Sequence, residues 1–453
     1  MKPRNLSDVA RAVRGSRLGD DVEVTSVAID SREVRSGDLF IALQGERVDG
    51  ARFVPEAFER GAAGALVPGG IDVDGPAVFV RSTNEALLDL AADERDRHEG
   101  AVVGVTGANG KTSTKDMTAA VCGSTFRTHA SPASFNNEIG APFTVLGASH
   151  DVEVIVAELG ARHVGDVAYL CSIVRPTIVV VTNVGVAHME IFGSWEKIVE
   201  ASAEPVEALG SGGVAVLNAD DPVVAGFAAR AAGDVVTFGR NPAADVRADD
   251  LSLDGEGRAS FTLEAGGQGV RVTLGVPGEH MVSNALAAAA VGAVLAVALD
   301  DAATALGGAT LSRWRMETFT NGDGVRVVND AYNANPESTA AALRTARWIA
   351  KDGALVAVLG QMAELGPIAL EEHERIGELA ARLGVDRLVV VGEDARPMAA
   401  AAVREGIEPE HVASYDDLDG ALADVRAHVR PGDTVLCKGS RVAGLERIAE
   451  ALR

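Results

Sequence analysis

Short, continuous apolar runs recur along the middle of the chain and alternate with longer stretches of helical periodicity. Such runs lie at residues 101–105, 154–157 and 177–181. A strand in a parallel sheet that is buried on both faces has this composition. A strand with one solvent-exposed face instead alternates apolar and polar residues. The pattern therefore predicts an α/β fold whose central parallel sheet is covered by helices on both faces.

A second set of buried strands is expected in the last third of the chain, at residues 355–359, 388–391 and 434–436. Helical stretches separate these runs, which predicts another doubly wound, Rossmann-like sheet. The start of the chain instead mixes short strands and helices, and it ends in the charged stretch 93–99. We interpret that stretch as a helix end or a linker.

These changes of pattern predict three domains, at residues 1–98, 99–312 and 313–453. Within the central domain, the glycine-rich stretch 266–269 indicates a hairpin. The alanine-rich, uncharged stretch 281–299 predicts a buried helix, because a membrane span needs about 20 strongly apolar residues.

Charge and cysteine content narrow the class of protein. The chain has 41 basic and 65 acidic side chains, for a formal net charge of −24. Such a surface disfavours nucleic acid and anionic membrane as partners, although simple solubility, or an organism with acidic proteins, is the commoner explanation of such a charge. The three cysteines are scattered, and the N-terminus lacks an apolar signal region. We therefore expect a reduced, cytoplasmic protein.

The strongest local signal is the sequence TGANGKTST at residues 106–114, between a predicted strand and a predicted helix. Glycines let the backbone wrap around phosphates, and a helix N-terminus adds amide donors and a positive dipole. Lys111 would reach the β- and γ-phosphates, and Thr112 would bind Mg²⁺. A chance glycine turn is the alternative, which the flanking strand and helix disfavour. The predicted nucleotide site comprises Thr106, Gly107, Ala108, Asn109, Gly110, Lys111, Thr112 and Ser113.

Two polar residues follow the buried strands nearest to this loop. Glu158 closes the run 154–157, and His188 comes shortly after the run 177–181. The carboxyl ends of parallel strands face the phosphate loop, where a carboxylate and an imidazole can hold Mg²⁺ beside the nucleotide. Each residue alone is more typical of a structural hydrogen bond. With the loop they predict a metal site of Thr112, Glu158 and His188, and a catalytic group of Lys111, Glu158 and His188.

A third cluster lies near the predicted junction of the last two domains. Arg315 precedes the sequence DAYNANP at residues 330–336. An Arg and an Asp at such a junction can clamp phosphate and ribose when domains close, so Arg315 and Asp330 are candidate nucleotide contacts. A turn rich in Asn and Pro is the structural alternative.

Together, TGANGKT, Glu158, His188, Arg315 and DAYNANP resemble the Mur ligases. The resemblance spans nearly the whole chain, because further stretches are similar to the family's outer domains. These stretches are DSR at 30–32, GDLFIAL at 37–43, DG at 49–50, FNNEIG at 135–140, GQMAELG at 360–366 with His373, and KGSR at 438–441.

The resemblance implies an ATP-dependent amide ligase of peptidoglycan synthesis, a process on which cell shape and division depend. DAYNANP and FNNEIG favour the member that adds D-alanyl-D-alanine to UDP-muramoyl-tripeptide. ATP and Mg²⁺ are then the cofactors. ATP phosphorylates the terminal carboxylate, the amine attacks the acyl-phosphate, and phosphate leaves. We expect a monomer with no nucleic-acid partner and no integral membrane segment.

The resemblance also distributes the substrates. It implies that the first domain binds the UDP-precursor, the central domain binds ATP and the C-terminal domain binds the incoming amine. Asn284 joins Arg315 and Asp330 as a nucleotide contact. The residues expected to bind the substrates are Ser31, Arg32, Asn136, Asn137, Tyr332, Asn333 and Asn335.

The sequence departs from the family at two positions near ATP. Ser202 stands where the family usually has a lysine that becomes carbamylated and helps to bind a second Mg²⁺. Glu200 and Glu204 should point elsewhere on a regular helix, although Pro205 can distort that helix. Met281 stands where the family usually has an asparagine near the adenine, and a thioether cannot bond the base edge in the same way.

Two alternatives stay open from the sequence. The chain can be another Mur-type amide ligase, such as a tripeptide or folyl-polyglutamate-type enzyme. It can also be a non-catalytic paralogue that binds nucleotide, a reading motivated by Ser202 and Met281.

Overall fold

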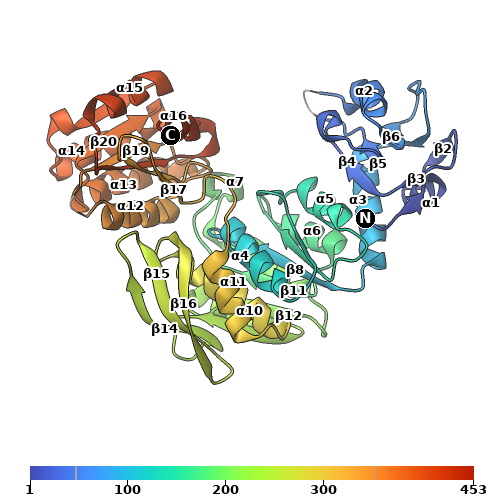
Figure 1. Ribbon diagram of the computed structural model, residues 1–453, viewed down its shortest axis with the longest axis horizontal. Coiled ribbons are helices and arrows are strands. Elements are labelled where there is room, and N and C mark those ends of the chain that lie inside the picture. The colour runs from blue at the N-terminus through green and yellow to red at the C-terminus, as the bar shows by residue number, and fades with distance from the viewer. Residues whose placement is uncertain (46–47, 352) are drawn as a thin grey trace.

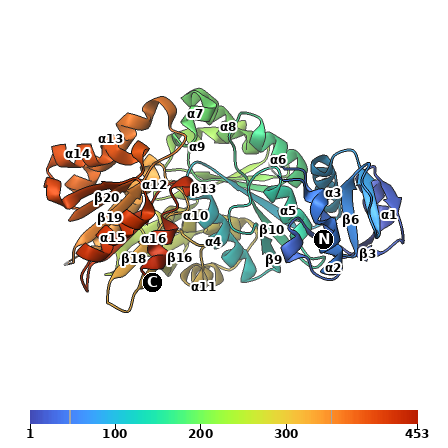
Figure 2. The same cartoon turned by 90° about the horizontal axis from the view of Figure 1, so that it is seen from above.

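The computed structural model describes residues 1–45, 48–351 and 353–453, which form three α/β units in chain order. The first unit (blue) and the last (orange to red) both sit on the middle unit and face each other across it (Figure 1). Seen from above, the three units lie in a row (Figure 2). The predicted α/β class is confirmed.

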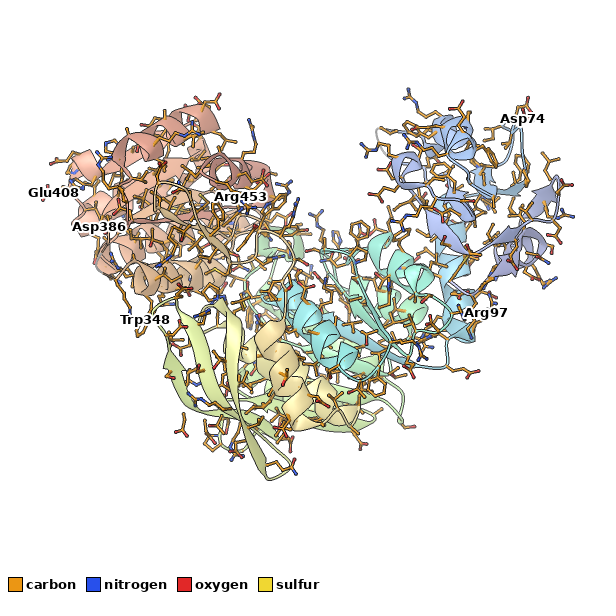
Figure 3. The ribbon with its side chains drawn as sticks, in the orientation of Figure 1. Asp74, Arg97, Trp348, Asp386, Glu408 and Arg453 are labelled. Atoms are coloured by element: carbon orange, nitrogen blue, oxygen red, sulfur yellow. The ribbon has the colours of Figure 1, made fainter. Side chains whose placement is uncertain are left out.

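The first unit is built on a mostly parallel sheet with strand order β2-β7-β6-β5-β4. Its helix α3 begins after Ser82, whose hydroxyl accepts a hydrogen bond from the Glu85 amide. This helix ends at Arg97, beside the middle unit (Figure 3), so the charged stretch 93–99 is a helix end. The elements of the unit are β1 (Arg4–Asn5), α1 (Leu6–Ala12), β2 (Ser16–Leu18), β3 (Glu23–Val24), β4 (Ser26–Ala28), β5 (Asp38–Ile41), α2 (Val54–Glu59), β6 (Gly64–Pro68), β7 (Ala77–Val80) and α3 (Thr83–Arg97).

The middle unit has the strand order β16-β15-β14-β13-β12-β11-β8-β10-β9. The strands from β9 to β14 pair in parallel, and β14, β15 and β16 form an antiparallel extension. Helices α4 and α10 pack on one face of the sheet, while α6 and α8 lie on the other (Figure 2). Its strands are β8 (Ala101–Thr106), β9 (Thr128–Ala130), β10 (Val154–Glu158), β11 (Ile178–Val181), β12 (Val214–Asn218), β13 (Asp234–Gly239), β14 (Val246–Leu253), β15 (Arg258–Ala265) and β16 (Gln268–Pro277). Its helices are α4 (Lys111–Gly123), α5 (Gly140–Gly147), α6 (Asp166–Val174), α7 (Met189–Phe192), α8 (Trp195–Glu207), α9 (Pro222–Gly226), α10 (Met281–Val294) and α11 (Leu299–Gly308).

The order of the middle strands determines where a ligand can bind. Strand β8 lies between β10 and β11, so the chain leaves β8 toward one edge of the sheet and later returns on the other side. Such a reversal opens a crevice at the carboxyl ends of the strands, which is where α/β sheets bind ligands. The TGANGKT loop emerges from β8 at this point.

The last unit has the strand order β17-β18-β22-β19-β20-β21, and all pairs beyond β17 are parallel. Trp348 of α12 ties this unit to the middle one, because its indole Nε1 donates to the Asp254 carbonyl at 2.8 Å (Figure 3). The elements are β17 (Glu317–Thr320), β18 (Arg326–Asn329), α12 (Pro336–Ala350), β19 (Leu355–Gly360), α13 (Ala369–Arg382), β20 (Arg387–Val391), α14 (Arg396–Glu405), β21 (Val412–Tyr415), α15 (Leu418–His428), β22 (Thr434–Lys438) and α16 (Glu446–Ala451).

The two local predictions for the middle unit have different outcomes. Gly266 and Gly267 connect β15 to β16 with φ of +56° and +78°, as expected for a hairpin turn. The helix expected over 281–299 is shorter, because α10 ends at Val294 and α11 begins at Leu299. Ala296 adopts φ +58°, and the next amide, of Val297, bonds back to the Gly292 carbonyl at 2.8 Å, which is a Schellman-type end.

Within the described residues, the helices are all too short or too polar to cross a membrane. The alanine-rich α10 is instead buried in the core against α4. Small side chains at this contact let the two helix backbones come close together.

We predict that Ala288→Leu destabilises the middle unit by about 1–3 kcal/mol, because extra methylenes in a packed core force neighbouring side chains off their rotamers. Ala288 is fully buried in α10, whereas Ala293 of the same helix is exposed. Thermal melting of Ala288→Leu and of the matched control Ala293→Leu checks this. A lower melting temperature is expected for the first variant only, and equal melting temperatures would show that α10 is loosely packed.

Candidate active site

The phosphate loop depends on two glycines. Gly107 has φ +133°, and a Cβ there would lie 2.1 Å from Thr182 Oγ1. Gly110 has φ +80°, and a Cβ there would lie 2.4 Å from Asn284 Oδ1. Both positions therefore exclude a side chain, because of backbone conformation and because of space.

Residues after β11 hold the loop in place. Asn183 accepts hydrogen bonds from two loop amides, from Ala108 at its carbonyl (3.0 Å) and from Asn109 at its side chain (2.8 Å). Thr182 Oγ1 donates to the Asn109 carbonyl at 2.6 Å. Two amides of the loop are thus already bonded. The amides available to a phosphate are those of the first turn of α4, which begins at Lys111 and leaves its first N–H groups without intrahelical partners.

Lys111 bends back over this loop. Its Nζ donates to the carbonyl of Gly107 at 2.7 Å and lies 3.4 Å from that of Ala108. Burial lowers the pKa of Lys111, the Glu158 carboxylate opposes that shift, and the nearby Arg315 guanidinium adds to it. The ammonium is therefore poorly solvated, and a bound phosphate would stabilise its charged form.

Arg315 reaches this loop from the beginning of the last unit. Its Nη2 donates to Thr112 Oγ1 at 3.1 Å, and its guanidinium lies 4.2 Å from the centroid of the Tyr332 ring. The residues on either side, Trp314 and Met316, have φ of +61° and +52°. Left-handed conformations of non-glycine residues cost about 1–3 kcal/mol each and cluster at functional sites.

A cavity of about 360 Å³ lies beside the loop, between the middle and last units. Asn335 crosses this boundary, because its Nδ2 donates to Asn109 Oδ1 at 2.6 Å while its Oδ1 caps helix α12. On the side of the last unit, Lys438 Nζ donates to Asp330 Oδ2 at 2.5 Å. Burial lowers the pKa of Lys438, and the Asp330 carboxylate opposes this shift. The cavity therefore has cations on both of its walls, which suits a polyphosphate.

A larger cleft of about 730 Å³ adjoins this cavity. Lys111 and Arg315 line both spaces, so the two meet at these cations. In the cleft, Glu158 Oε1 accepts a hydrogen bond from Asn136 Nδ2 at 2.8 Å. Glu158 Oε2 is buried and has no hydrogen-bond partner within the described part of the chain. A buried carboxylate oxygen left open in this way is a position where a cation would bind.

His188 lines the same cleft and contacts the last unit. Its Nδ1 pairs with the carboxylate of Glu364, which also accepts from Arg162 Nη2 at 3.0 Å. Burial and then Lys111 lower the pKa of His188, while Glu364 raises it. Both His188 (φ +62°) and Glu364 (φ +64°) are left-handed. The Glu364 contact orients the imidazole and leaves Nε2 free to face a ligand.

The residues fit a Mg²⁺ ion that is shared with the substrate. Mg²⁺ in phosphoryl-transfer sites is held by one or two protein ligands together with phosphate oxygens and water. Glu158 offers an unpartnered carboxylate oxygen, His188 a ring nitrogen and Thr112 a hydroxyl at the phosphate loop. Among the described residues, three or more His, Cys, Asp or Glu side chains do not come together as a complete protein cage. The donor set therefore suits an ion completed by phosphate.

Ser202 lies beside Lys111 and His188, on a small cavity of about 40 Å³. Its hydroxyl donates to the Ile198 carbonyl at 2.7 Å, within α8. Glu204 points away and accepts from the amides of Gly165 (2.5 Å) and Ala168 (2.9 Å), as expected for its helical position. Pro205 lies inside α8 without turning Ser202 out of the site.

Met281 is buried at the start of α10, where its sulfur accepts from Asn284 Nδ2 at 3.4 Å. Both residues line the smaller cavity. The side-chain amide of Asn284, a predicted nucleotide contact, is therefore engaged in a hydrogen bond to the Met281 thioether.

The structure brings most of the predicted site residues together. The walls of the two cavities and of the small space at Ser202 include Thr106, Gly107, Ala108, Asn109, Gly110, Lys111, Thr112, Ser113, Asn136, Asn137, Glu158, His188, Asn284, Arg315, Asp330, Tyr332, Asn333 and Asn335. Ser31 and Arg32 lie apart in the first unit, where Ser31 Oγ donates to Glu56 at 2.9 Å and Arg32 pairs with Asp30 at 2.6 Å.

Sequence reasoning missed several residues of the site. Asn183 carried a usable signal, because it follows a predicted buried strand on the phosphate side. Ser134, 3.0 Å from Thr112 Oγ1, carried none. Glu364 lies in the family-like stretch GQMAELG, but nothing there indicated its contact with His188, which is distant in sequence.

Comparison with known proteins agrees with this geometry. Residues 23–95 match the Mur ligase family catalytic domain, residues 105–292 the Mur ligase middle domain, and residues 314–441 the glutamate ligase domain of Mur ligases. The UDP-N-acetylmuramoyl-tripeptide–D-alanyl-D-alanine ligase of Mycobacterium tuberculosis is 42% identical, over 94% of this chain and 92% of the relative. The enzyme of the same name from Bacillus subtilis is 34% identical, over 100% and 99%.

Solved structures show the same likeness. MurF from Acinetobacter baumannii superposes with a TM-score of 0.87 at 30% identity, covering 99% of this chain and 98% of its own. MurF ligase from Thermotoga maritima in complex with ADP gives 0.79 at 29% identity, covering 95% and 97%. With its loop, its junction of two cavities and these matches along its whole length, the chain belongs to the Mur ligase family.

Proposed function

We propose that this chain is an ATP-dependent ligase that adds D-alanyl-D-alanine to UDP-N-acetylmuramoyl-tripeptide during peptidoglycan precursor synthesis. The observation that carries the proposal is the meeting of a nucleotide-sized cavity and a larger cleft at Lys111 and Arg315. Full-length relatives with this activity in their names support the choice of substrates.

The first step joins two anions. ATP occupies the smaller cavity, with its γ-phosphate directed past Lys111 toward the cleft, where the terminal carboxylate of the tripeptide lies. A carboxylate oxygen attacks the γ-phosphorus and ADP leaves, which gives an acyl-phosphate. Lys111 and Arg315 neutralise the transferring phosphoryl group, and the amides at the start of α4 hold the β-phosphate. Positioning and charge compensation account for such catalysis without a protein nucleophile.

Thr112, Glu158 and His188 would hold Mg²⁺ at this junction. The ion supplies charge neutralisation at the phosphate oxygens when it is bound. Glu158 is fixed for this role by Asn136, and His188 by Glu364.

In the second step the ammonium of D-alanyl-D-alanine loses a proton to solvent, and the free amine attacks the acyl carbon. Phosphate then leaves with one of the original carboxylate oxygens, and the nitrogen loses a second proton to become the amide. The incoming dipeptide carries an ammonium and a carboxylate. The wall that the last unit contributes to the cleft offers a matching pair, Glu364 and Arg441. Arg441 is half-exposed, lies 4.6 Å from the centroid of the Trp314 ring, and pairs with Glu446 at 2.5 Å. Its remaining N–H groups can receive the dipeptide carboxylate.

The first unit completes the substrate site. Ser31 and Arg32 bind the UDP-sugar end of the precursor, some distance from the reacting carboxylate. The first and last units face each other across the middle unit (Figure 1), a placement that suits a long substrate whose far end reaches the cleft. Because both substrates are precursors that precede export, the enzyme acts in the cytoplasm.

A non-catalytic nucleotide-binding role is the second candidate, and the observation behind it is Ser202 beside Lys111 and His188. One assay separates the two. The purified chain is incubated with ATP, Mg²⁺, UDP-muramoyl-tripeptide and D-alanyl-D-alanine, and the pentapeptide product and ADP are measured. Equal amounts of both, dependent on each substrate, support the ligase. Binding of nucleotide without product at any Mg²⁺ concentration supports the second role.

Lys111→Ala is expected to abolish ligation, lowering kcat/KM by about 10²–10³ or more, because it removes an electrostatic contact to the transferring phosphate. Binding of the UDP-precursor should survive. The matched control is Lys197→Ala, an exposed lysine on α8, which should retain the wild-type rate. Near wild-type turnover in Lys111→Ala would show that the loop is not the ATP site.

Ser202→Lys is expected to make the activity respond to bicarbonate, because Ser202 lines the same small cavity as Lys111 and His188 and a lysine there can form a carbamate. The wild type should not respond to added or removed bicarbonate. Initial rates in degassed and bicarbonate-supplemented buffer test both statements. A bicarbonate-dependent wild type would contradict the assignment and direct attention to another lysine.

Arg441→Gln should raise the KM for D-alanyl-D-alanine roughly ten- to a hundredfold, because a hydrogen bond to a charged group is worth about 1.5–3 kcal/mol. The KM for ATP should be unchanged. Arg447→Gln, in the exposed part of the neighbouring helix α16, is the control. If both variants give the same KM for the dipeptide, Arg441 does not bind its carboxylate.

A further inference from the structure

Lys115 is a buried cation with no part in the mechanism above. It lies one helical turn after Lys111 in α4 and is 2% exposed. Its Nζ donates to the carbonyls of Ser131 (2.8 Å) and Ala133 (2.9 Å) and pairs with Asp116 Oδ1 at 2.6 Å. A lysine in such a setting must have its charge fully compensated, since an unpaired buried charge is very costly.

The carbonyls that Lys115 holds belong to a segment that touches both sides of the reaction. Ser134 Oγ lies 3.0 Å from Thr112 Oγ1 on the phosphate side, and Asn136 Nδ2 donates to Glu158 at 2.8 Å on the cleft side. Ala133 directly precedes Ser134, and its carbonyl accepts from Lys115. It adopts the left-handed φ of +44°. The segment 131–137 is thus kept in a strained conformation by contacts that include the Lys115 ammonium.

Asp116 connects the same helix to the last unit. Its Oδ1 pairs with Lys115, and its Oδ2 accepts a hydrogen bond from the Ser312 amide at 2.7 Å. Ser312 lies three residues before Arg315, which reaches Thr112. One buried ion pair therefore links the helix of the phosphate loop, the segment 131–137 and the chain that carries Arg315.

We propose that Lys115 and Asp116 form a positioning pair that sets the cleft side of the active site, where the carboxylate of the UDP-precursor accepts the phosphoryl group, relative to the phosphate loop. Lys115 fixes the segment 131–137, and Asp116 fixes the start of the last unit. The pair does not touch the nucleotide cavity, whose loop is held independently by Asn183. The kinetic consequences of this proposal rest on the proposed function. The effect of the pair on the segment 131–137 can be measured without turnover.

The kinetic test uses Lys115→Met, which keeps length and removes charge, and the milder Asp116→Asn, which keeps an acceptor for the Ser312 amide. Each variant should lower kcat about tenfold and raise the KM for the UDP-precursor by a similar factor, since small misplacements of reacting groups cost up to about a hundredfold. Affinity for a non-hydrolysable ATP analogue, measured by calorimetry, should stay within about twofold. A purely structural role would not separate the two substrates.

The second measurement is amide hydrogen exchange over residues 131–137 in the full-length protein, which does not depend on activity. Both variants should exchange faster there, while the peptides of β8 and the phosphate loop stay as in the wild type. The matched control is Asp424→Asn, which breaks a buried pair with Arg387 (2.5 Å) in the last unit. That variant should melt at a lower temperature but leave both KM values and the exchange of 131–137 unchanged.

Two results would overturn the proposal. The first is unchanged hydrogen exchange over residues 131–137 in Asp116→Asn, and in Lys115→Met if that variant folds. The second is an equal loss of affinity for the UDP-precursor and for the ATP analogue. An inactive wild type would instead count against the proposed function alone. In that case faster exchange in the variants would still establish that the pair positions the segment.

Discussion

The repulsion between two anions is the constraint on which this architecture depends. A γ-phosphate and a carboxylate must come within bonding distance, although two unit charges 4 Å apart repel by about 4 kcal/mol at an effective dielectric constant near 20. In the proposed mechanism Lys111 and Arg315 offset this cost, because both cations line the smaller cavity and the cleft. The strand order reverses around β8, and Gly107 and Gly110 leave room that would let the backbone approach a phosphate.

The two cations come from different units, so the site exists only when those units are in contact. Asn335 bonds to Asn109 of the loop, and Glu364 pairs with His188, across the same boundary. Left-handed backbone conformations at Trp314, Met316, His188 and Glu364 occur at these contacts. Part of the backbone strain therefore lies where the two units meet, and the surrounding contacts hold it there. In the proposed mechanism, contact across this boundary would also keep water from hydrolysing the acyl-phosphate.

Sequence reasoning recovered what depends on local pattern. The apolar runs identified the parallel strands, and the glycine loop predicted as a nucleotide site lies between a strand and a helix, beside a cavity. Contacts between distant residues were out of reach, because nothing in the sequence near Glu364 or Ser134 indicates His188 or Thr112 as partners. The helix expected over 281–299 was too long, because the Schellman-type end at Ala296 uses alanine where glycine would have marked it. The roles of Ser31 and Arg32 stay predictions, since both side chains are occupied within the first unit.

The central claim is that a carboxylate in the cleft attacks a phosphate held at Lys111, and the path of one oxygen atom tests it directly. UDP-muramoyl-tripeptide labelled with ¹⁸O in its terminal carboxylate is ligated to D-alanyl-D-alanine, and the released phosphate is analysed by mass spectrometry. The account predicts one ¹⁸O atom per phosphate, because the acyl-phosphate breaks at the acyl carbon and the bridging oxygen leaves with phosphorus. Product formation with unlabelled phosphate would contradict the acyl-phosphate, and with it the role given to the meeting point of the two cavities.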